Sequence, residues 1–228
     1  MTSALEPPVL AEGLALIFDM DGVLVDSNAA HCEAWIAYNR RFGLETTESM
    51  IGRMYGRRND QIVRDYFGSE LSDEEVGRRG ADKERLYRAM IEPRLELMLV
   101  PGLRPFLARY RQAPMAVASN AEPENVSFLL DRAGLREFFR VVVDGHQVSR
   151  PKPDPEIYLY AAQGLEVAPE NAIVFEDSLS GVEAARAAGM RVVGLLTTLD
   201  NLPGTVICAD NFLGRELHTW LATQKRAV

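Results

Sequence analysis

Two aspartates end the first apolar stretch of the chain. Asp19 and Asp21 stand two residues apart in Phe-Asp-Met-Asp-Gly, directly after the apolar residues 14–18. Two carboxylates this close repel each other, and one would take up a proton unless a cation lies beside them. Mg²⁺ prefers oxygen ligands and often pairs with a substrate phosphate. The pair therefore predicts a magnesium site, although a plain Asp-Gly turn would have the same local sequence.

A calcium-binding loop that starts at Asp19 is excluded by the residues that follow it. Such a loop needs an acidic or amide side chain at its fifth position and a glutamate at its twelfth. These positions hold Val23 and Ala30. A magnesium site and a turn without chemistry remain the two interpretations of the pair.

Three later motifs place polar side chains near the ends of apolar runs. Ser119 and Asn120 end the second run and can bind phosphoryl oxygens. Lys152 is a lone cation within Arg-Pro-Lys-Pro-Asp-Pro, and Glu176 and Asp177 follow the fourth run. Taken singly, the lysine fits a surface residue and the acids fit a helix cap. Because ligands bind at the carboxyl ends of strands in open parallel sheets, their shared placement favours one site.

Short apolar runs predict the strands that position these residues. Continuous runs are typical of strands covered on both faces, and helical patterns separate most of them. This alternation predicts an α/β fold with a doubly wound, mostly parallel, Rossmann-like sheet. The predicted strands are Leu14–Phe18, Met115–Ser119, Val141–Val143, Ile173–Phe175 and Val192–Leu195, with Val206–Cys208 as a less apolar sixth.

Residues 28–99 interrupt this alternation and predict an inserted helical cap. The segment holds no convincing strand, and its apolar residues follow helical spacing in three stretches. Ser72-Asp73-Glu74-Glu75 is a capping box that begins the third helix. We therefore predict a core of residues 1–27 and 100–228, a cap of residues 28–99, and hinges at residues 25–28 and 99–102.

Composition and charge exclude several classes of protein. The chain has 228 residues, and its formal net charge of -8 argues against a nucleic-acid binder. No apolar run approaches the ~18 residues of a membrane helix, and no signal-peptide pattern is seen. Cys32 and Cys208 lie far apart and fit reduced thiols. We expect a cytoplasmic protein, and a monomer because no heptad pattern is present.

Four motifs occur in the order found in one superfamily. They are DMDGVLVDS at residues 19–27, ASN at 118–120, RPKPDP at 150–155 and FEDSLSGVEAARAAGM at 175–190. This set resembles the haloacid dehalogenase superfamily of phosphotransfer enzymes. More narrowly, the chain is similar to the β-phosphoglucomutase-like and sugar-phosphatase group with a helical cap. The resemblance extends from Leu14 to about Leu217, and it is specific for the superfamily but not for the substrate.

The resemblance implies a role for each matching residue. Asp19 would attack phosphorus and form an aspartyl-phosphate, and Asp21 would act as general acid and then as general base. Lys152 would neutralise the nucleophile and the phosphate. The implied phosphate-binding residues are Ser119, Asn120 and Gly22, and the implied Mg²⁺ ligands are Asp19, the carbonyl of Asp21, Asp177 and, directly or through water, Glu176. Asp21 also disfavours dehalogenation, because a halide leaves without a proton.

In such enzymes the cap determines which leaving group is accepted. Two residues of the predicted cap resemble those of the mutase. His31 and Trp35 stand in DSNAAHCEAW, at residues 26–35, which is similar to a mutase pattern. In that relative the histidine couples cap closure to catalysis. The alternatives are a half-buried helix histidine and a tryptophan of the cap core rather than a sugar platform.

Other cap positions depart from the mutase pattern. Tyr55 and Asn59 stand where the mutase carries a lysine and an arginine around its cap glycine, here Gly56. Arg57 and Arg58 are displaced by one or two places. They would either reach a distal phosphate or remain ordinary solvated arginines.

The position after the second motif also departs from the mutase. The mutase follows this motif with a serine and a lysine for the sugar phosphate, whereas this chain has Asn120-Ala121-Glu122-Pro123. An acid at Glu122 is poorly suited to a second phosphate. We therefore expect a Mg²⁺-dependent phosphatase whose partner is a small phosphorylated metabolite, such as a sugar phosphate. A phosphosugar mutase and a catalytically silent binding protein with this fold are the alternatives.

Overall fold

A parallel sheet forms the centre of the molecule. The computed structural model describes residues 10–55 and 57–227, and within them the sheet has the order β3-β2-β1-β4-β5-β6 with every neighbouring pair parallel. The strands are β1 (Ala15–Phe18), β2 (Met115–Ala118), β3 (Val141–Val143), β4 (Ala172–Glu176), β5 (Arg191–Leu195) and β6 (Ile207–Ala209). The predicted doubly wound α/β fold is confirmed, and all six predicted strands are present.

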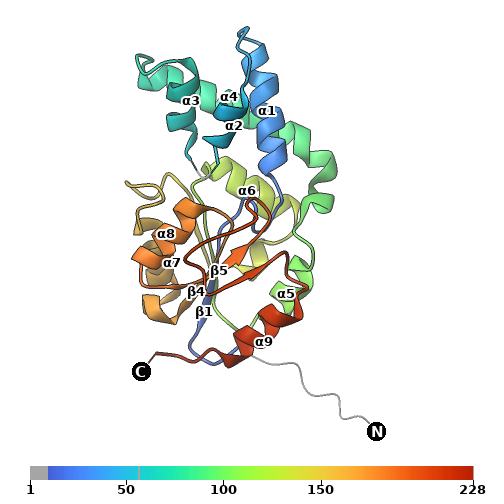
Figure 1. The fold of residues 1–228 in the computed structure, drawn as a ribbon, viewed down its shortest axis with the longest axis vertical. Helices are drawn as coiled ribbons and strands as arrows, with labels where there is room; N and C mark the ends of the chain where they lie inside the picture. Colours follow the sequence, from blue (N-terminus) through green and yellow to red (C-terminus); the bar gives the residue numbers. More distant parts are fainter. Residues whose placement is uncertain (1–9, 56, 228) are drawn as a thin grey trace.

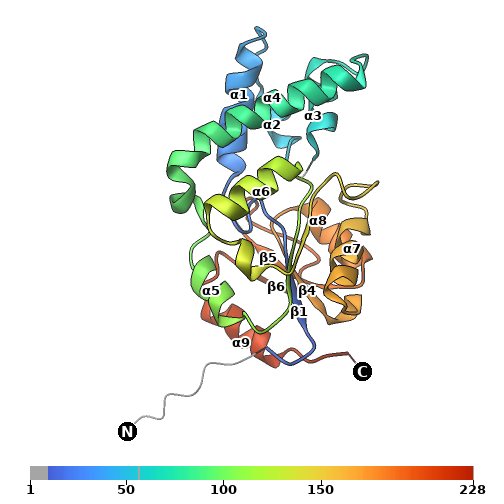
Figure 2. The same ribbon diagram turned by 180° about the vertical axis from the view of Figure 1, so that it is seen from behind.

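Helices cover both faces of this sheet (Figures 1 and 2). One face carries α7 (Glu156–Leu165) and α8 (Leu179–Ala187), and the other carries α5 (Leu103–Arg109), α6 (Pro123–Arg132) and α9 (Arg215–Thr223). Successive side chains of β1 point to opposite layers, since Leu16 and Phe18 belong to one apolar cluster and Ala15 and Ile17 to the other. The two layers hold β1 rigidly, with both of its faces buried.

Aromatic rings fill the layer that contains α5 and α9. Phe106 is 1% exposed, and its ring centroid lies 4.7 Å from that of Phe212 and 5.4 Å from that of Phe175. Phe106→Ala is expected to lower the free energy of unfolding by about 3–5 kcal/mol, because it removes these contacts and leaves a cavity. Urea denaturation measures the change. Leu97→Ala is the control, since that side chain is 89% exposed; equal losses for both variants would contradict the packing.

A helical cap lies beyond the carboxyl ends of the strands (Figure 1). It contains α1 (Asn28–Arg40), α2 (Glu48–Gly52), α3 (Asn59–Phe67) and α4 (Asp73–Ile91), followed by the 3-10 segment η1 (Glu92–Met98). These helices share an apolar cluster that includes Trp35, Tyr38 and Val63. The Ser72 side chain accepts a hydrogen bond of 3.2 Å from the backbone N–H of Glu75, as the capping box predicts.

The two segments that connect core and cap run side by side. Backbone hydrogen bonds of 2.8 and 3.1 Å join residues 24–26 to residues 98–100, and Val25 and Leu99 form an antiparallel bridge. These segments overlap the predicted hinges. The cap therefore leaves the core and returns to it at one place.

No helix in the described ranges is both long and apolar enough to cross a bilayer. Both cysteines, Cys32 and Cys208, are free thiols. The fold therefore rests on its apolar layers rather than on covalent cross-links.

Candidate active site

A tight turn after β1 positions the two aspartates. The carbonyl of Met20 accepts hydrogen bonds from the N–H groups of Leu24 and Val25, at 2.9 and 3.2 Å. Gly22 has a φ of +76°, and a Cβ there would lie 1.8 Å from Oδ2 of Asp177. Only glycine accommodates both this backbone conformation and the close approach. The Asp-Gly dipeptide thus turns the chain and lets the loops after β1 and β4 meet.

Lys152 joins the carboxyl ends of β1 and β4 in a buried cluster. Its Nζ lies 2.7 Å from Oδ1 of Asp19 and 2.6 Å from Oε1 of Glu176. The Lys152 side chain is 3% exposed, so solvent screens these contacts little. The ammonium group therefore offsets part of the negative charge of both carboxylates.

The Glu176 carboxylate is saturated with hydrogen bonds. Oε1 accepts from Lys152 and, at 2.6 Å, from the Tyr158 hydroxyl. Oε2 accepts from the N–H groups of Asp177 and Ser178 and from the Ser178 hydroxyl, at 2.9, 3.1 and 3.0 Å. Burial acts to raise the pKa of Glu176, but Lys152 and these donors hold it below its ordinary value. A direct bond from Glu176 to a metal would require one of these contacts to be exchanged.

Tyr158 is expected to position Glu176 and Lys152. Its hydroxyl is buried against Glu176, and its ring centroid lies 4.7 Å from Nζ of Lys152. Tyr158→Phe should lower kcat about tenfold with little change in KM, because one hydrogen bond to a charged group is lost. Steady-state kinetics measure this. Tyr160→Phe, on the same helix and 49% exposed, is the matched control; equal kcat values in the two variants would refute the positioning role.

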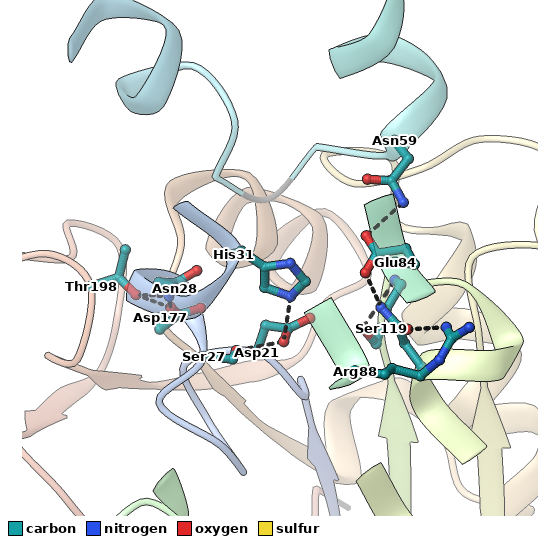
Figure 3. Close-up of polar contacts among 12 residues, drawn as sticks. Asp21, Ser27, Asn28, His31, Asn59, Glu84, Arg88, Ser119, Asp177 and Thr198 are labelled. Carbon is teal, nitrogen blue, oxygen red and sulfur yellow. Dashed lines mark hydrogen bonds and ion pairs between the residues drawn. The ribbon is translucent and has the colours of Figure 1, made fainter. Parts of the chain in front are cut away.

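Asp177 presents its carboxylate at the same edge of the sheet. Its Oδ2 accepts a hydrogen bond of 3.1 Å from Nδ2 of Asn28 and another from the Thr198 hydroxyl (Figure 3). Asn28 begins α1, and Thr198 follows β5. Donors from two separate parts of the chain therefore orient this carboxylate.

The charge of the cluster fits a divalent cation. Asp19, Glu176 and Asp177 each offer a carboxylate oxygen, and these oxygens lie within 4.8 Å of one another. Burial raises the pKa of Asp19 to about 7 although Lys152 opposes it, and burial with the two neighbouring acids raises the pKa of Asp177 well above its usual range. One lysine does not balance three carboxylates. An all-oxygen donor set with excess negative charge is the kind that Mg²⁺ prefers.

Ser119 and Asn120 follow β2 at this edge. The Ser119 side chain is buried, and its Oγ accepts a hydrogen bond of 3.1 Å from the N–H of Ala121. Oδ1 of Asn120 accepts from the backbone N–H of Lys152 at 3.3 Å. Both residues line a cavity of about 600 Å³ together with Asp19, Asp21, Lys152 and Asp177. The structure thus brings Asp19, Asp21, Asp177, the lysine and the polar pair that the motifs single out into one cavity. Glu176 contacts Lys152 but is fully buried and is not part of the cavity lining.

A family comparison decides what this cavity belongs to. The family model described as haloacid dehalogenase-like hydrolase matches residues 14–189. The chain belongs to this family. It is therefore an enzyme of the haloacid dehalogenase-like hydrolases, as the four motifs predict.

Two relatives of this haloacid dehalogenase-like hydrolase have names that refer to phosphorylated sugars. The chain is 34% identical over 194 residues to the phosphorylated carbohydrates phosphatase of Thermotoga maritima, with 82% of this chain and 87% of the relative covered. It is 33% identical to the fructose-1-phosphate phosphatase YqaB of Escherichia coli, with 78% and 94% covered. The crystal structure of β-phosphoglucomutase from Clostridium difficile superposes with a TM-score of 0.80 at 26% identity, covering 91% and 96%. The predicted resemblance to sugar phosphatases and β-phosphoglucomutase is confirmed.

In this hydrolase, α1 of the cap contacts Asp21 through His31, and α4 contacts His31. Nε2 of His31 lies 3.3 Å from Oδ1 of Asp21, and the Ser27 hydroxyl donates to the same oxygen at 2.5 Å (Figure 3). Nδ1 of His31 lies 2.7 Å from Nζ of Lys83, and the ring stacks on Tyr87 with centroids 3.8 Å apart. Burial acts to raise the pKa of Asp21, but His31 and Ser27 bring it below its ordinary value. The ionised, proton-accepting form of Asp21 is thus favoured in this arrangement.

Trp35 and Tyr55 lie on the cap side of the cavity. Trp35 is 1% exposed, and its ring packs against Tyr66 with centroids 5.2 Å apart. This places Trp35 in the cap core, where little of its ring is available to a sugar. Tyr55 is half-buried and lines the cavity, while Gly56 lies outside the described residues.

Arg57 and Arg58 also line the cavity but pair with cap carboxylates. Nη1 of Arg57 lies 3.2 Å from Oδ2 of Asp65, and Nε of Arg58 lies 3.6 Å from Oδ1 of Asp60. Both contacts stay within the cap. The structure therefore brings neither arginine into contact with the acids at the ends of the strands.

Several residues of the site were missed in the sequence. Thr198 follows a strand as Ser119 and Asp177 do, so the same strand-end rule could have identified it. Asn28 comes directly after the first motif. Tyr158 and Lys83 lie inside helices, and no local signal separates them from ordinary helix residues.

Proposed function

We propose that the chain is a Mg²⁺-dependent phosphatase that hydrolyses a small phosphate monoester of the sugar-phosphate class. The observation that carries this proposal is the contact of 2.7 Å between Lys152 and Asp19 in a cavity that also contains Ser119 and Asp177. Phosphoryl transfer depends chiefly on positioning and on neutralising charge, and this cavity has groups for both. The names of the two phosphatase relatives support the substrate class.

In the proposed reaction Asp19 attacks phosphorus, the ester P–O bond breaks, and an aspartyl-phosphate forms. Asp21, protonated in the enzyme–substrate complex, gives its proton to the leaving oxygen. It then takes a proton from the water that attacks phosphorus, which restores its protonated form. Inorganic phosphate leaves, and the Asp19 carboxylate is restored. Lys152 offsets the charge of the phosphoryl group throughout. Ser119, Asn120 and the backbone at Gly22 bind the oxygens of the phosphoryl group.

The metal ligands proposed are Asp19, Asp177 and the backbone carbonyl of Asp21, with Glu176 supporting them through water. Bound Mg²⁺ would supply positive charge against the phosphoryl oxygens. Glu176 has a second task, because its saturated carboxylate holds Lys152 beside Asp19. Asn28 and Thr198 keep the Asp177 carboxylate turned toward the cluster.

We further propose that residues 28–99 close as a cap over a core of residues 1–27 and 100–228. Residues 1–9, 56 and 228 of these ranges lie outside the described structure. Closure would exclude bulk water from the aspartyl-phosphate until the leaving group has departed. A cytoplasmic monomer without a nucleic-acid partner completes the proposal.

Phosphate release from a panel of monoesters tests this function. The panel contains hexose 6-phosphates, fructose 1-phosphate, β-glucose 1-phosphate, phosphoglycolate, nucleotides and p-nitrophenyl phosphate. Release should require Mg²⁺, should stop with EDTA, and should return when Mg²⁺ is restored in excess.

Two outcomes would replace the proposal. Conversion of β-glucose 1-phosphate to glucose 6-phosphate without net release, primed by a bisphosphate, would make the enzyme a mutase. Absence of turnover across the panel would favour the silent binding protein.

A further inference from the structure

Glu122 and Asn59 meet where the cap faces the core. Asn59 is the first residue of α3 in the cap, and Glu122 is the N-cap residue of α6 in the core. Nδ2 of Asn59 donates to Oε1 of Glu122 at 2.8 Å. It also donates to Oε1 of Glu84 at 2.7 Å (Figure 3). Both Asn59 and Glu122 line the cavity that contains Asp19. Asn59 and Glu122 can therefore contact a ligand bound in the cavity.

The two carboxylates that Asn59 contacts differ in their surroundings. Glu84 receives Nζ of Lys83 at 2.8 Å and Nδ2 of Asn125 at 2.6 Å. Although burial acts to raise it, the pKa of Glu84 is held at about 2, with Lys83 the strongest opposing influence. The negative charge of Glu84 is thus already compensated by groups of the protein, so we do not assign this carboxylate to substrate binding.

The negative charge of the Glu122 carboxylate is compensated far less than that of Glu84. Among residues 10–55 and 57–227, Asn59 is the hydrogen-bond donor to its carboxylate, and no lysine, arginine or histidine lies within 4.0 Å of it. The exposed His146 lowers the pKa of Glu122 from a distance, but burial outweighs it and the pKa is raised. The Glu122 carboxylate is therefore a hydrogen-bond acceptor in the cavity wall with capacity left for a ligand.

Most cations of the cavity wall are paired with carboxylates other than Glu122. Within the described part of the chain, the wall contains seven lysines and arginines, which are Arg57, Arg58, Arg64, Lys83, Arg85, Arg88 and Lys152. All of them except Arg88 pair with an aspartate or glutamate other than Glu122. Arg88 instead donates to Oδ1 of Asn125 at 2.6 Å. Among the described residues of the wall, Arg88 is therefore the one lysine or arginine that is not paired with a carboxylate, and a second phosphate in this region would also face Glu122.

The helix opposite the pair leaves room for it. Gly80 lies inside α4, where glycine is a poor helix former. A Cβ at Gly80 would lie 3.3 Å from Cβ of Asn59 and 3.3 Å from Oε1 of Glu122. The absent side chain therefore gives Asn59 and Glu122 the space in which they meet.

From these contacts we propose that Glu122, held in place by Asn59, restricts the cavity to substrates that carry one phosphate and an uncharged, hydroxyl-bearing remainder. An ionised carboxylate only accepts hydrogen bonds, so it can bind the hydroxyl groups of a sugar or polyol. It repels the second phosphate of a bisphosphate, because juxtaposed like charges are costly where water is excluded. This inference rests on the proposed phosphatase function and adds the residue that selects among phosphate esters.

The test compares substrates that differ by one phosphate. kcat/KM is measured for fructose 1-phosphate, fructose 6-phosphate and fructose 1,6-bisphosphate, and p-nitrophenyl phosphate reports the chemistry without a sugar. The variants are Glu122→Gln, which has nearly the same shape, and Glu122→Lys, which reverses the charge. Glu137→Gln is the control, since it removes one exposed negative charge from η2 (Arg136–Phe138), outside the cavity wall.

The wild type should prefer the better monophosphate over the bisphosphate. Glu122→Gln should reduce this preference about tenfold, because about 1.4 kcal/mol of repulsion is removed, and Glu122→Lys should reduce it further. Glu122→Gln should still hydrolyse p-nitrophenyl phosphate, which has no sugar hydroxyl groups for Glu122 to bind, and this activity shows that the variant is folded. Glu137→Gln should keep the wild-type preference.

Three results would overturn the inference. The first is an unchanged preference in Glu122→Gln and Glu122→Lys while p-nitrophenyl phosphate is still hydrolysed. The second is a wild type that prefers the bisphosphate, which would indicate that Arg88 binds the second phosphate. The third is a wild type without metal-dependent release from any substrate, and only this result overturns the proposed phosphatase function as well.

Discussion

Asp19→Asn is expected to abolish metal-dependent phosphate release, with kcat/KM falling by roughly 10⁴-fold or more. Asparagine keeps the size of the side chain, but its amide is a far weaker nucleophile than a carboxylate. The change also removes one of the three clustered carboxylates to which we assign the metal. Phosphate release from the best sugar phosphate of the panel measures the loss.

The control for this variant is Asp131→Asn. Asp131 lies on the surface in an ion pair with Arg136, and its replacement should leave kcat/KM within about twofold of the wild type. Far-ultraviolet circular dichroism verifies that Asp19→Asn is folded. Activity retained by a folded Asp19→Asn would show that another group attacks phosphorus.

Asp21→Asn is expected to separate the two halves of the reaction. With a sugar phosphate, kcat should fall by about 10²–10⁴-fold, because the alkoxide leaving group is no longer protonated. Nitrophenolate leaves without a proton, so p-nitrophenyl phosphate should still form the aspartyl-phosphate. Hydrolysis of that intermediate then lacks its general base.

Stopped-flow absorbance with p-nitrophenyl phosphate checks this expectation. Asp21→Asn should release about one nitrophenolate per enzyme in a burst and then turn over slowly, the signature of an accumulated covalent intermediate. A uniform loss of activity on both substrates, without a burst, would argue that Asp21 supports binding rather than proton transfer. Asp131→Asn again serves as the control.

The strands could be predicted because burial on both faces demands continuous apolar residues. Every residue of β1 is buried, and the same holds for β2 and β4. The short helices could not be predicted in this way. No residue of α2 is buried, so it carries no apolar periodicity, and α5 has only seven residues.

The site could be predicted where it follows strands. Asp19, Ser119 and Asp177 come directly after β1, β2 and β4, so topology alone brings them to one edge. Tyr158 and Glu84 lie within helices, and their partners are 18 and 41 residues away in sequence. Contacts of that kind depend on how helices pack against the sheet, which local patterns do not encode.

The two hydrogen-bonded segments that connect core and cap affect how the substrate range of such an enzyme can change. Residues 24–26 and 98–100 are already hydrogen-bonded to each other, so the chain between them is a loop whose ends meet. The entropy of closing such a loop grows only slowly with its length. Helices can therefore be lengthened, shortened or exchanged between these two points without pulling on β1, where Asp19 and Asp21 are anchored. Mutations in the cap can thus change substrate specificity without moving Asp19 and Asp21.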